Sequence, residues 1–272
     1  MSETNQQNVE EPSAPTLETL IAPVLDPLRG RAGLGTLIRA AIAGQIRCLD
    51  IVDELNVRFN ALLGRYVNNP EGFRDLLDNT ESVISGSFAL RFMEGSGRWR
   101  EGDMDLYVEP GSLERVKESL REEGYEDIHT AHDGREYRRA GGTIERVVGM
   151  TNVTRNVRID VIVSSKKISV YPIADFWATH LMNFLSGSVI CVGYPETLDN
   201  AGFVIPGRME DWKVPILLGK YLRRGFNFPP MPAELRGIVR YFGDSECIVI
   251  PVRRGGRVFC GGPIANSVVW KV

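Results

Sequence analysis

The hydrophobic pattern of this chain changes its period near residue 80. Between Leu34 and Tyr66 the apolar residues recur mostly at steps of three and four, which predicts one long or interrupted helix. After residue 80, short apolar runs alternate with segments of helical spacing, so strands and helices follow one another. This order predicts an α/β or α+β fold, with a mixed sheet that is flanked by helices.

The same pattern divides the chain into four parts. We expect a disordered tail over 1–16, a helical segment over 17–80, a core over 81–170, and a helical and β extension over 171–272 that packs on the core. Within the core, strands are expected over 82–84, 104–108, 143–150 and 156–163, with helices after Gly86-Ser87 and between Ser112 and Gly124. In the extension, helices are expected over 172–185 and 212–223, and strands over 247–252 and 258–270 around a turn at 254–257.

Composition excludes several classes of protein. The 32 Lys and Arg against 35 Asp and Glu give a net charge of −3, so no overall basic field attracts a phosphate polymer. Four well-separated cysteines lack the spacing of a zinc site, and no apolar run reaches the roughly 18 residues of a membrane span. We therefore expect an intracellular protein, cytoplasmic or nuclear, without a membrane partner.

Asp103 and Asp105 stand at alternate positions of a predicted strand. Side chains two residues apart in a strand share a face, so both carboxylates point to one side, opposite Met104 and Leu106. Their mutual repulsion favours a divalent cation, and Mg²⁺ commonly binds one or two carboxylates together with substrate phosphates. As single features, these residues are equally typical of solvated charges at a loop edge.

Asp160 lies in a predicted strand, Val157–Val163, in which Ile159, Val161 and Val163 face one way while Arg158 and Asp160 face the other. A carboxylate within buried sheet needs a partner or a metal ion, because burying an unpaired charge is costly. If this strand lies beside the strand of Asp103 and Asp105, three carboxylates converge on one place. That arrangement suits phosphoryl or nucleotidyl transfer with two metal ions.

Gly86-Ser87 lies between a short apolar run and a predicted helix. A glycine lets the backbone approach a phosphate closely, and the N-terminus of a helix directs free N–H groups and partial positive charge to the same point. The Ser87 hydroxyl adds another donor. A simple turn is the alternative interpretation of this dipeptide.

In this order, the three motifs resemble those of the polymerase-beta-like nucleotidyltransferase superfamily. The motifs are Ile84-Ser-Gly-Ser87, Gly102-Asp-Met-Asp-Leu106 and Ile159-Asp-Val161, and the resemblance covers about residues 80–165. The stretch 168–228 also resembles the continuation found in nucleotidyltransferase-like proteins of fungi. Two departures are a long insertion between Ser87 and Asp103 and a glycine, Gly102, where a serine commonly precedes the paired acids.

The resemblance implies roles for individual residues. Asp103 and Asp105 would be metal ligands, Asp160 the third carboxylate that helps to activate an acceptor hydroxyl, and Gly86 and Ser87 the triphosphate site. The implied reaction moves a nucleoside monophosphate from a nucleoside triphosphate such as ATP to a hydroxyl of a small molecule, a protein or a short RNA, with Mg²⁺ or Mn²⁺. The alternative is a catalytically inactive module of the same fold that binds a nucleotide or a partner.

Further cationic and imidazole side chains have two interpretations each. Arg91, one helical turn after Ser87, either reaches a phosphate or is exposed, and Lys213 and Lys220 either clamp a triphosphate or form a solvated helix face. His180 is expected to pack beside Trp177. His129 and His132, in a polar loop, are expected to be surface residues rather than metal ligands.

Overall fold

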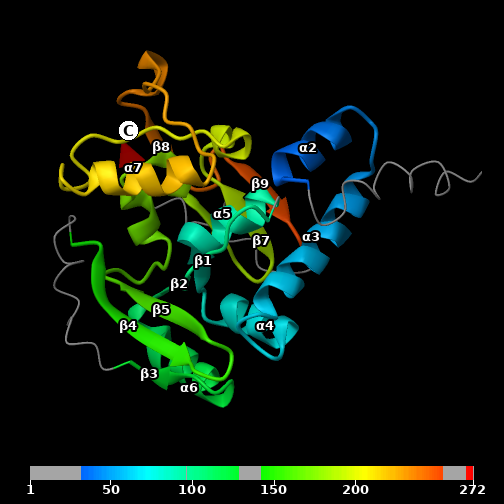
Figure 1. Ribbon diagram of the computed structural model, residues 1–272, viewed down its shortest axis with the longest axis vertical. Helices are drawn as coiled ribbons and strands as arrows, with labels where there is room; N and C mark the ends of the chain where they lie inside the picture. Colours follow the sequence, from blue (N-terminus) through cyan, green and yellow to red (C-terminus); the bar gives the residue numbers. More distant parts are fainter. Residues whose placement is uncertain (1–31, 96, 129–141, 254–267, 272) are drawn as a thin grey trace, which may run out of the picture.

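The computed structural model describes residues 32–95, 97–128, 142–253 and 268–271. Its centre is a sheet of eight strands in the order β3-β4-β5-β2-β1-β6-β7-β9 (Figure 1). The strands are β1 (Val83–Ser85), β2 (Met104–Val108), β3 (Glu126–Asp127), β4 (Ile144–Asn152), β5 (Val157–Ser164), β6 (Asn183–Leu185), β7 (Val189–Val192) and β9 (Ile248–Pro251). Within the described ranges β2 and β5 run parallel and every other neighbouring pair in this sheet is antiparallel, so the predicted mixed α/β class is confirmed.

The helices before the sheet follow the predicted pattern with one interruption. The stripe from Leu34 to Tyr66 forms two helices, α2 (Leu34–Ile42) and α3 (Cys48–Leu63), because the chain turns through Gly44 at φ +69°. Helix α4 (Pro70–Asn79) begins where Asn69-Pro70 predicts a boundary, and the Asn69 side chain accepts a hydrogen bond from the Gly72 backbone at 3.0 Å. These helices therefore begin and end at local signals that the sequence carries.

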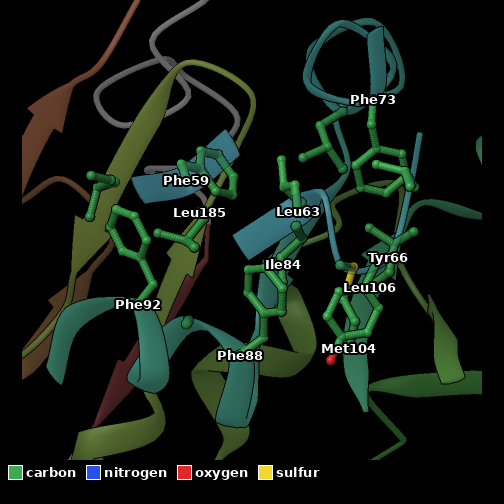
Figure 2. Close-up of a cluster of buried hydrophobic side chains, with 14 of the residues drawn as sticks. Phe59, Leu63, Tyr66, Phe73, Ile84, Phe88, Phe92, Met104, Leu106 and Leu185 are labelled. Carbon is green, nitrogen blue, oxygen red and sulfur yellow. The ribbon is translucent and has the colours of Figure 1, made fainter. Parts of the chain in front are cut away.

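One face of the sheet is covered by the helices. Helices α5 (Gly86–Glu94) and α6 (Leu113–Glu122) join α2, α3 and α4 over the side chains that β2 and β5 direct to this side, such as Leu106 and Val161. Figure 2 shows Phe59 and Phe92 of α3 and α5 among the side chains packed there. The opposite face carries Tyr107 and Ile162, so alternation along β2 and β5 separates a helix-covered core from a second face.

The prediction of a helix over 172–185 is wrong. This stretch forms two 3₁₀ turns, Tyr171–Asp175 and Thr179–Leu181, and then strand β6. The spacing of Trp177, Leu181 and Leu185 matches a helix, but Leu185 pairs with Ile84 of β1 while β6 forms a hairpin with β7. Burial within the sheet and backbone pairing on both edges outweigh the helical spacing.

The remainder of the extension fits the prediction better. Helix α7 (Val214–Arg223) and strand β9 correspond to the expected helix over 212–223 and the expected strand over 247–252. Strands β8 (Val239–Tyr241) and β10 (Val269–Lys271) form a separate antiparallel pair. The tail 1–16, the turn 254–257, His129, His132 and most of 258–270 lie outside the described residues. Among the helices of the described ranges, none combines the length and the apolar character that crossing a membrane requires.

Candidate active site

A pocket of about 610 Å³ opens on the face of the sheet that the helices α2 to α6 leave free. Its floor comes from β2, β4 and β5, and its opposite wall comes from residues 207–210 and α7. The predicted site residues that line it are Gly86, Ser87, Asp103, Asp105, Asp160, Lys213 and Lys220. Seven residues from four separate parts of the chain therefore meet around one space, which has a volume typical of small-molecule sites.

The three carboxylates are brought together by strand register. Parallel pairing of β2 with β5 sets Asp105 directly beside Asp160, and Asp103 precedes Asp105 by two residues on the same face. The antiparallel neighbour β1 places Ser85 opposite Asp105, so the chain enters the Gly86-Ser87 turn next to the acids. The expected adjacency of the two acidic strands is therefore found.

Gly86 has a structural role that the sequence did not indicate. Its φ is +63°, and a Cβ at this position would lie 2.1 Å from Oδ2 of Asp105. The space above Gly86 is thus filled by the Asp105 carboxylate, and any side chain there would displace it. The glycine was expected to admit a phosphate to the backbone, whereas here it admits an acidic side chain.

Among the three acids, Asp105 is the one whose charged form is most disfavoured by its surroundings. Burial first, and then the negative charges of Asp103 and Asp160, raise the pKa of Asp105 to about 7, while Lys220 and Arg158 act in the opposite direction. Within the described part of the chain, the Asp105 carboxylate makes no hydrogen bond and no ion pair. Either a proton or a bound cation lowers the free-energy cost of a carboxylate in this setting.

Asp160 already has a cationic partner. The Nε of Arg158 donates to Oδ1 of Asp160 at 2.7 Å, and Gly149 on β4, the register partner of Asp160, leaves room beside this pair. Burial raises the pKa of Asp160, and the bond and charge of Arg158 oppose that shift. The prediction that a buried Asp160 needs a partner is confirmed, and the partner is Arg158, which alternation places on the same face of the strand but which was not predicted to pair with the acid.

The donor set fits a hard divalent cation in its chemistry, since it consists of carboxylate oxygens that face one pocket. As the side chains stand, no group of three His, Cys, Asp or Glu residues in the described ranges is arranged to hold a metal ion. The Asp160 carboxylate is turned to Arg158 instead. A cation that used all three acids would have to compete with that guanidinium.

The predicted phosphate-binding cations differ in their placement. Lys220 faces the pocket from α7, and burial and the charge of Arg224 lower its pKa although Asp103 and Asp105 oppose the change. Lys213 also lines the pocket but is paired with Glu210 at 3.2 Å. Arg91 is not among the lining residues, and its guanidinium lies 3.6 Å from the Glu94 carboxylate on the same helix. The structure thus brings the two lysines, and not Arg91, to the acids.

His180 packs as expected, but not on a helix. Its ring is fully buried between Trp177, Tyr221, Phe226 and Phe228, with centroid distances of 5.6, 4.5, 5.2 and 4.9 Å. Neither ring nitrogen has a hydrogen-bond partner within the described ranges, and burial lowers the pKa of His180 to about 3. A neutral imidazole behind the pocket wall is therefore part of an aromatic cluster.

The pocket also contains residues that the sequence analysis did not select. They are mainly apolar and lie beyond the acids: Tyr107, Ile144, Val147, Ile162, Pro172, Phe176, Trp177, Leu181, Met209, Leu217 and Tyr221. A signal for two of them was present, because Tyr107 shares a strand face with Asp105 and Ile162 shares one with Asp160. The others come from turns and from a helix whose position the sequence does not fix.

Comparison of the chain with protein-family models, with curated proteins and with solved structures found no match in any of the three searches. The residues of the pocket therefore carry the whole functional argument.

Proposed function

We propose that the chain is a nucleotidyltransferase, which moves a nucleoside monophosphate from a nucleoside triphosphate to a hydroxyl acceptor. The observation that carries the proposal is the meeting of Asp103, Asp105 and Asp160 with Gly86-Ser87 in one pocket. Clustered carboxylates can bind the divalent cations of phosphoryl transfer, and the N-terminus of a helix can bind the phosphate oxygens. The motif order of the sequence supports the same class.

Each side chain has a role in this proposal. Asp103 and Asp105 would hold Mg²⁺ or Mn²⁺, which supplies charge neutralisation of the phosphates and a lower pKa for the attacking hydroxyl. The Ser87 hydroxyl and the backbone N–H groups at the start of α5 donate to the phosphates that leave, and the Lys220 ammonium pairs with them. The Asp160 carboxylate orients the acceptor hydroxyl once it is released from Arg158.

The proposed reaction balances without a further reactant. The acceptor oxygen forms a bond to the α-phosphorus, the bond from that phosphorus to the bridging oxygen breaks, and pyrophosphate leaves. The hydroxyl proton passes to the Asp160 carboxylate and from there to solvent. Most of the rate enhancement would come from positioning and from charge stabilisation.

The test is pyrophosphate release from a panel of nucleoside triphosphates with Mg²⁺ and a mixture of alcohol acceptors. We expect release by the wild type and none by Asp105→Asn. The matched control is Asp53→Asn, which makes the same change on the exposed side of α3, away from the pocket, and should leave release unchanged. A wild type that binds nucleotide but releases no pyrophosphate with any acceptor would contradict the transferase proposal.

One observation favours a second candidate, a nucleotide-binding module without catalysis. Arg158 neutralises Asp160 at 2.7 Å, so the pocket can be stable with one of its three acids permanently paired. Such a module would bind nucleotide as well in EDTA as in Mg²⁺. A transferase would need the cation for tight binding, because the unpaired acids repel a triphosphate.

A further inference from the structure

The pocket continues past the acids onto an apolar surface. We call this surface the apolar end and define it by Tyr107, Ile144, Val147, Ile162 and Phe176. Strand register places Tyr107 beside Ile162 and Val147 beside Ile162, so three neighbouring strands contribute to one floor. The Phe176 ring stands over it, 6.2 Å from the Tyr107 ring in an edge-to-face contact.

The apolar end lies on one side of the acids and the phosphate-binding turn lies on the other. Tyr107 and Ile162 are register partners two residues beyond the paired Asp105 and Asp160. The antiparallel strand β1 passes from Val83, opposite Tyr107, to Ser85, opposite Asp105, before it reaches Gly86 and Ser87. Along the strands, Asp105 and Asp160 therefore stand between the apolar end and the Gly86-Ser87 turn. Any ligand that reaches across the pocket must pass the carboxylates.

This order has a consequence for the proposed reaction. In phosphoryl transfer the attacking and the leaving oxygens are roughly in line through the phosphorus, so they occupy opposite sides of it. If pyrophosphate leaves toward Ser87, the acceptor attacks from the side of Tyr107 and Ile162. That side is the apolar end, and Asp160 borders it because it precedes Ile162 by two residues on the same face of β5.

We propose that the apolar end binds the acceptor, and that the acceptor is a small alcohol with an aromatic or apolar group next to its hydroxyl. The inference rests on the proposed transferase function and specifies its substrate class. Burial of a ring against Val147, Ile162 and Phe176 supplies the binding energy, and the hydroxyl is then held beside Asp160.

The charges of the pocket argue against a nucleic-acid acceptor. A strand end needs several cations along its phosphates. Of the pocket-lining residues in the described ranges, the cations are Arg208, Lys213 and Lys220, all on the wall opposite the sheet floor. Arg208 is held by Asp175 at 2.9 Å and Lys213 by Glu210 at 3.2 Å, and Lys220 is assigned to the leaving phosphates.

The first experiment measures binding without turnover. Ligand-observed NMR would follow 2-phenylethanol and glycerol with the full chain, alone and with the non-cleavable analogue α,β-methylene-ATP plus Mg²⁺. We expect 2-phenylethanol, and not glycerol, to bind, and to bind equally well when the analogue is present. Displacement of 2-phenylethanol by the analogue would mean that the apolar end takes the nucleotide base, and would overturn the inference.

Variants locate the bound alcohol. Val147→Asp should weaken 2-phenylethanol binding at least tenfold, while the matched control Val153→Asp, on an exposed turn of the same hairpin, should leave it unchanged. Val147→Thr keeps the shape of the side chain and serves if Val147→Asp does not fold, with an expected loss of about threefold. Unchanged affinity in a folded Val147 variant would overturn the inference.

The second experiment separates the acceptor class from the proposed function. Pyrophosphate release from ATP and Mg²⁺ would be compared for 2-phenylethanol, glycerol and a short RNA with a free 3′ hydroxyl. We expect the highest kcat/KM for 2-phenylethanol, and we expect Val147→Thr to raise the KM for the alcohol without changing the KM for ATP. Preference for RNA or glycerol would overturn the acceptor class and leave the transferase intact. Release with none of the three would overturn both.

Discussion

The two walls of the pocket differ in how tightly their residues are paired and packed. The sheet wall carries the acids on β2 and β5, which pair over five consecutive residues from Met104–Ile159 to Val108–Val163. The opposite wall is α7 and the preceding loop, where only Tyr221 of the helix is buried and Trp212 and Ile216 are 64% and 63% exposed. Rigid strands thus position the charged groups, while a loosely packed helix supplies the lysines. We therefore expect substitutions in the sheet wall to abolish function and substitutions in α7 to adjust affinity.

The largest effect is expected for Asp105→Asn. The change keeps the side-chain volume but removes a cation ligand, so pyrophosphate release should fall by about 100-fold or more. The free energy of unfolding of the same variant should increase. The raised pKa of Asp105 means that the folded wild type binds a proton more tightly than the unfolded chain, so its stability falls as pH rises from about 4 to about 7. The variant lacks this loss and should be more stable at pH 8 by about 1–3 kcal/mol, measured by urea unfolding.

The same experiment contains its own control. At pH 4 the folded carboxyl is protonated and the unfolded one, with an ordinary pKa of 3.8, is only about half ionised, so wild type and variant should unfold at similar urea concentrations. An equal difference at pH 4 and pH 8 would contradict the argument that buried charge destabilises Asp105.

Gly86→Ala tests the contact between the turn and the acid. The new Cβ would overlap Oδ2 of Asp105 at 2.1 Å, so the carboxylate must move and pyrophosphate release should fall about 100-fold. Gly225→Ala is the matched control, since Gly225 has φ +89° and open space around its Cα. Both variants carry the same backbone strain of about 1 kcal/mol or more. Equal activity in the two variants would show that strain alone, rather than displacement of Asp105, is responsible for any loss.

On the α7 wall, Lys220→Met should weaken nucleotide binding about tenfold with a smaller change in kcat. Lys213→Met should weaken it only about twofold, because Lys213 is already paired with Glu210. Isothermal titration at two salt concentrations measures both, with a steeper salt dependence expected for the wild type than for Lys220→Met. A larger effect at Lys213 than at Lys220 would reverse the assignment of the two lysines.

A small effect in the opposite direction is expected for Arg158→Gln. Loss of the guanidinium frees Asp160, so the Mg²⁺ concentration that half-saturates nucleotide binding should fall about threefold. The Arg158 side chain is 45% exposed, and solvent screening limits the change. Arg146→Gln on β4 is the matched control, because Arg146 is similarly exposed and lies outside the pocket lining. A higher Mg²⁺ requirement in Arg158→Gln would mean that the arginine supports the ligand site instead of competing with the cation.

The difference between the two walls also explains which features of the pocket could be predicted from the sequence. Alternation in Met104–Val108 and Val157–Ser164 fixes which side chains share a face, so the convergence of Asp103, Asp105 and Asp160 follows once the strands are neighbours. The face on which a side chain lies depends on a short-range pattern that every residue of the segment reinforces, whereas the adjacency of β2 and β5 entered only as a condition. The sheet wall was therefore predictable to the level of individual carboxylates.

Other features depend on contacts between distant segments. The 172–185 stretch has helical spacing, yet pairing of Leu185 with Ile84 and of β6 with β7 selects strand. The close approach of Asp105 to Gly86 and the apolar end likewise arise from contacts between segments that are far apart in the sequence. Tertiary packing decides these features, so they were wrong or missing in the sequence analysis.

The central claim is that the acids of the sheet wall make nucleotide binding depend on a divalent cation. The most direct measurement is the thermal shift of the wild type and of Asp105→Asn with ATP, in Mg²⁺ and in EDTA. A ligand that binds only the folded chain stabilises it by RT ln(1 + [L]/Kd) and therefore raises its melting temperature. We expect ATP to stabilise the wild type in Mg²⁺ but not in EDTA, and to stabilise Asp105→Asn in neither. Equal stabilisation of the wild type by ATP in EDTA and in Mg²⁺ would contradict the account.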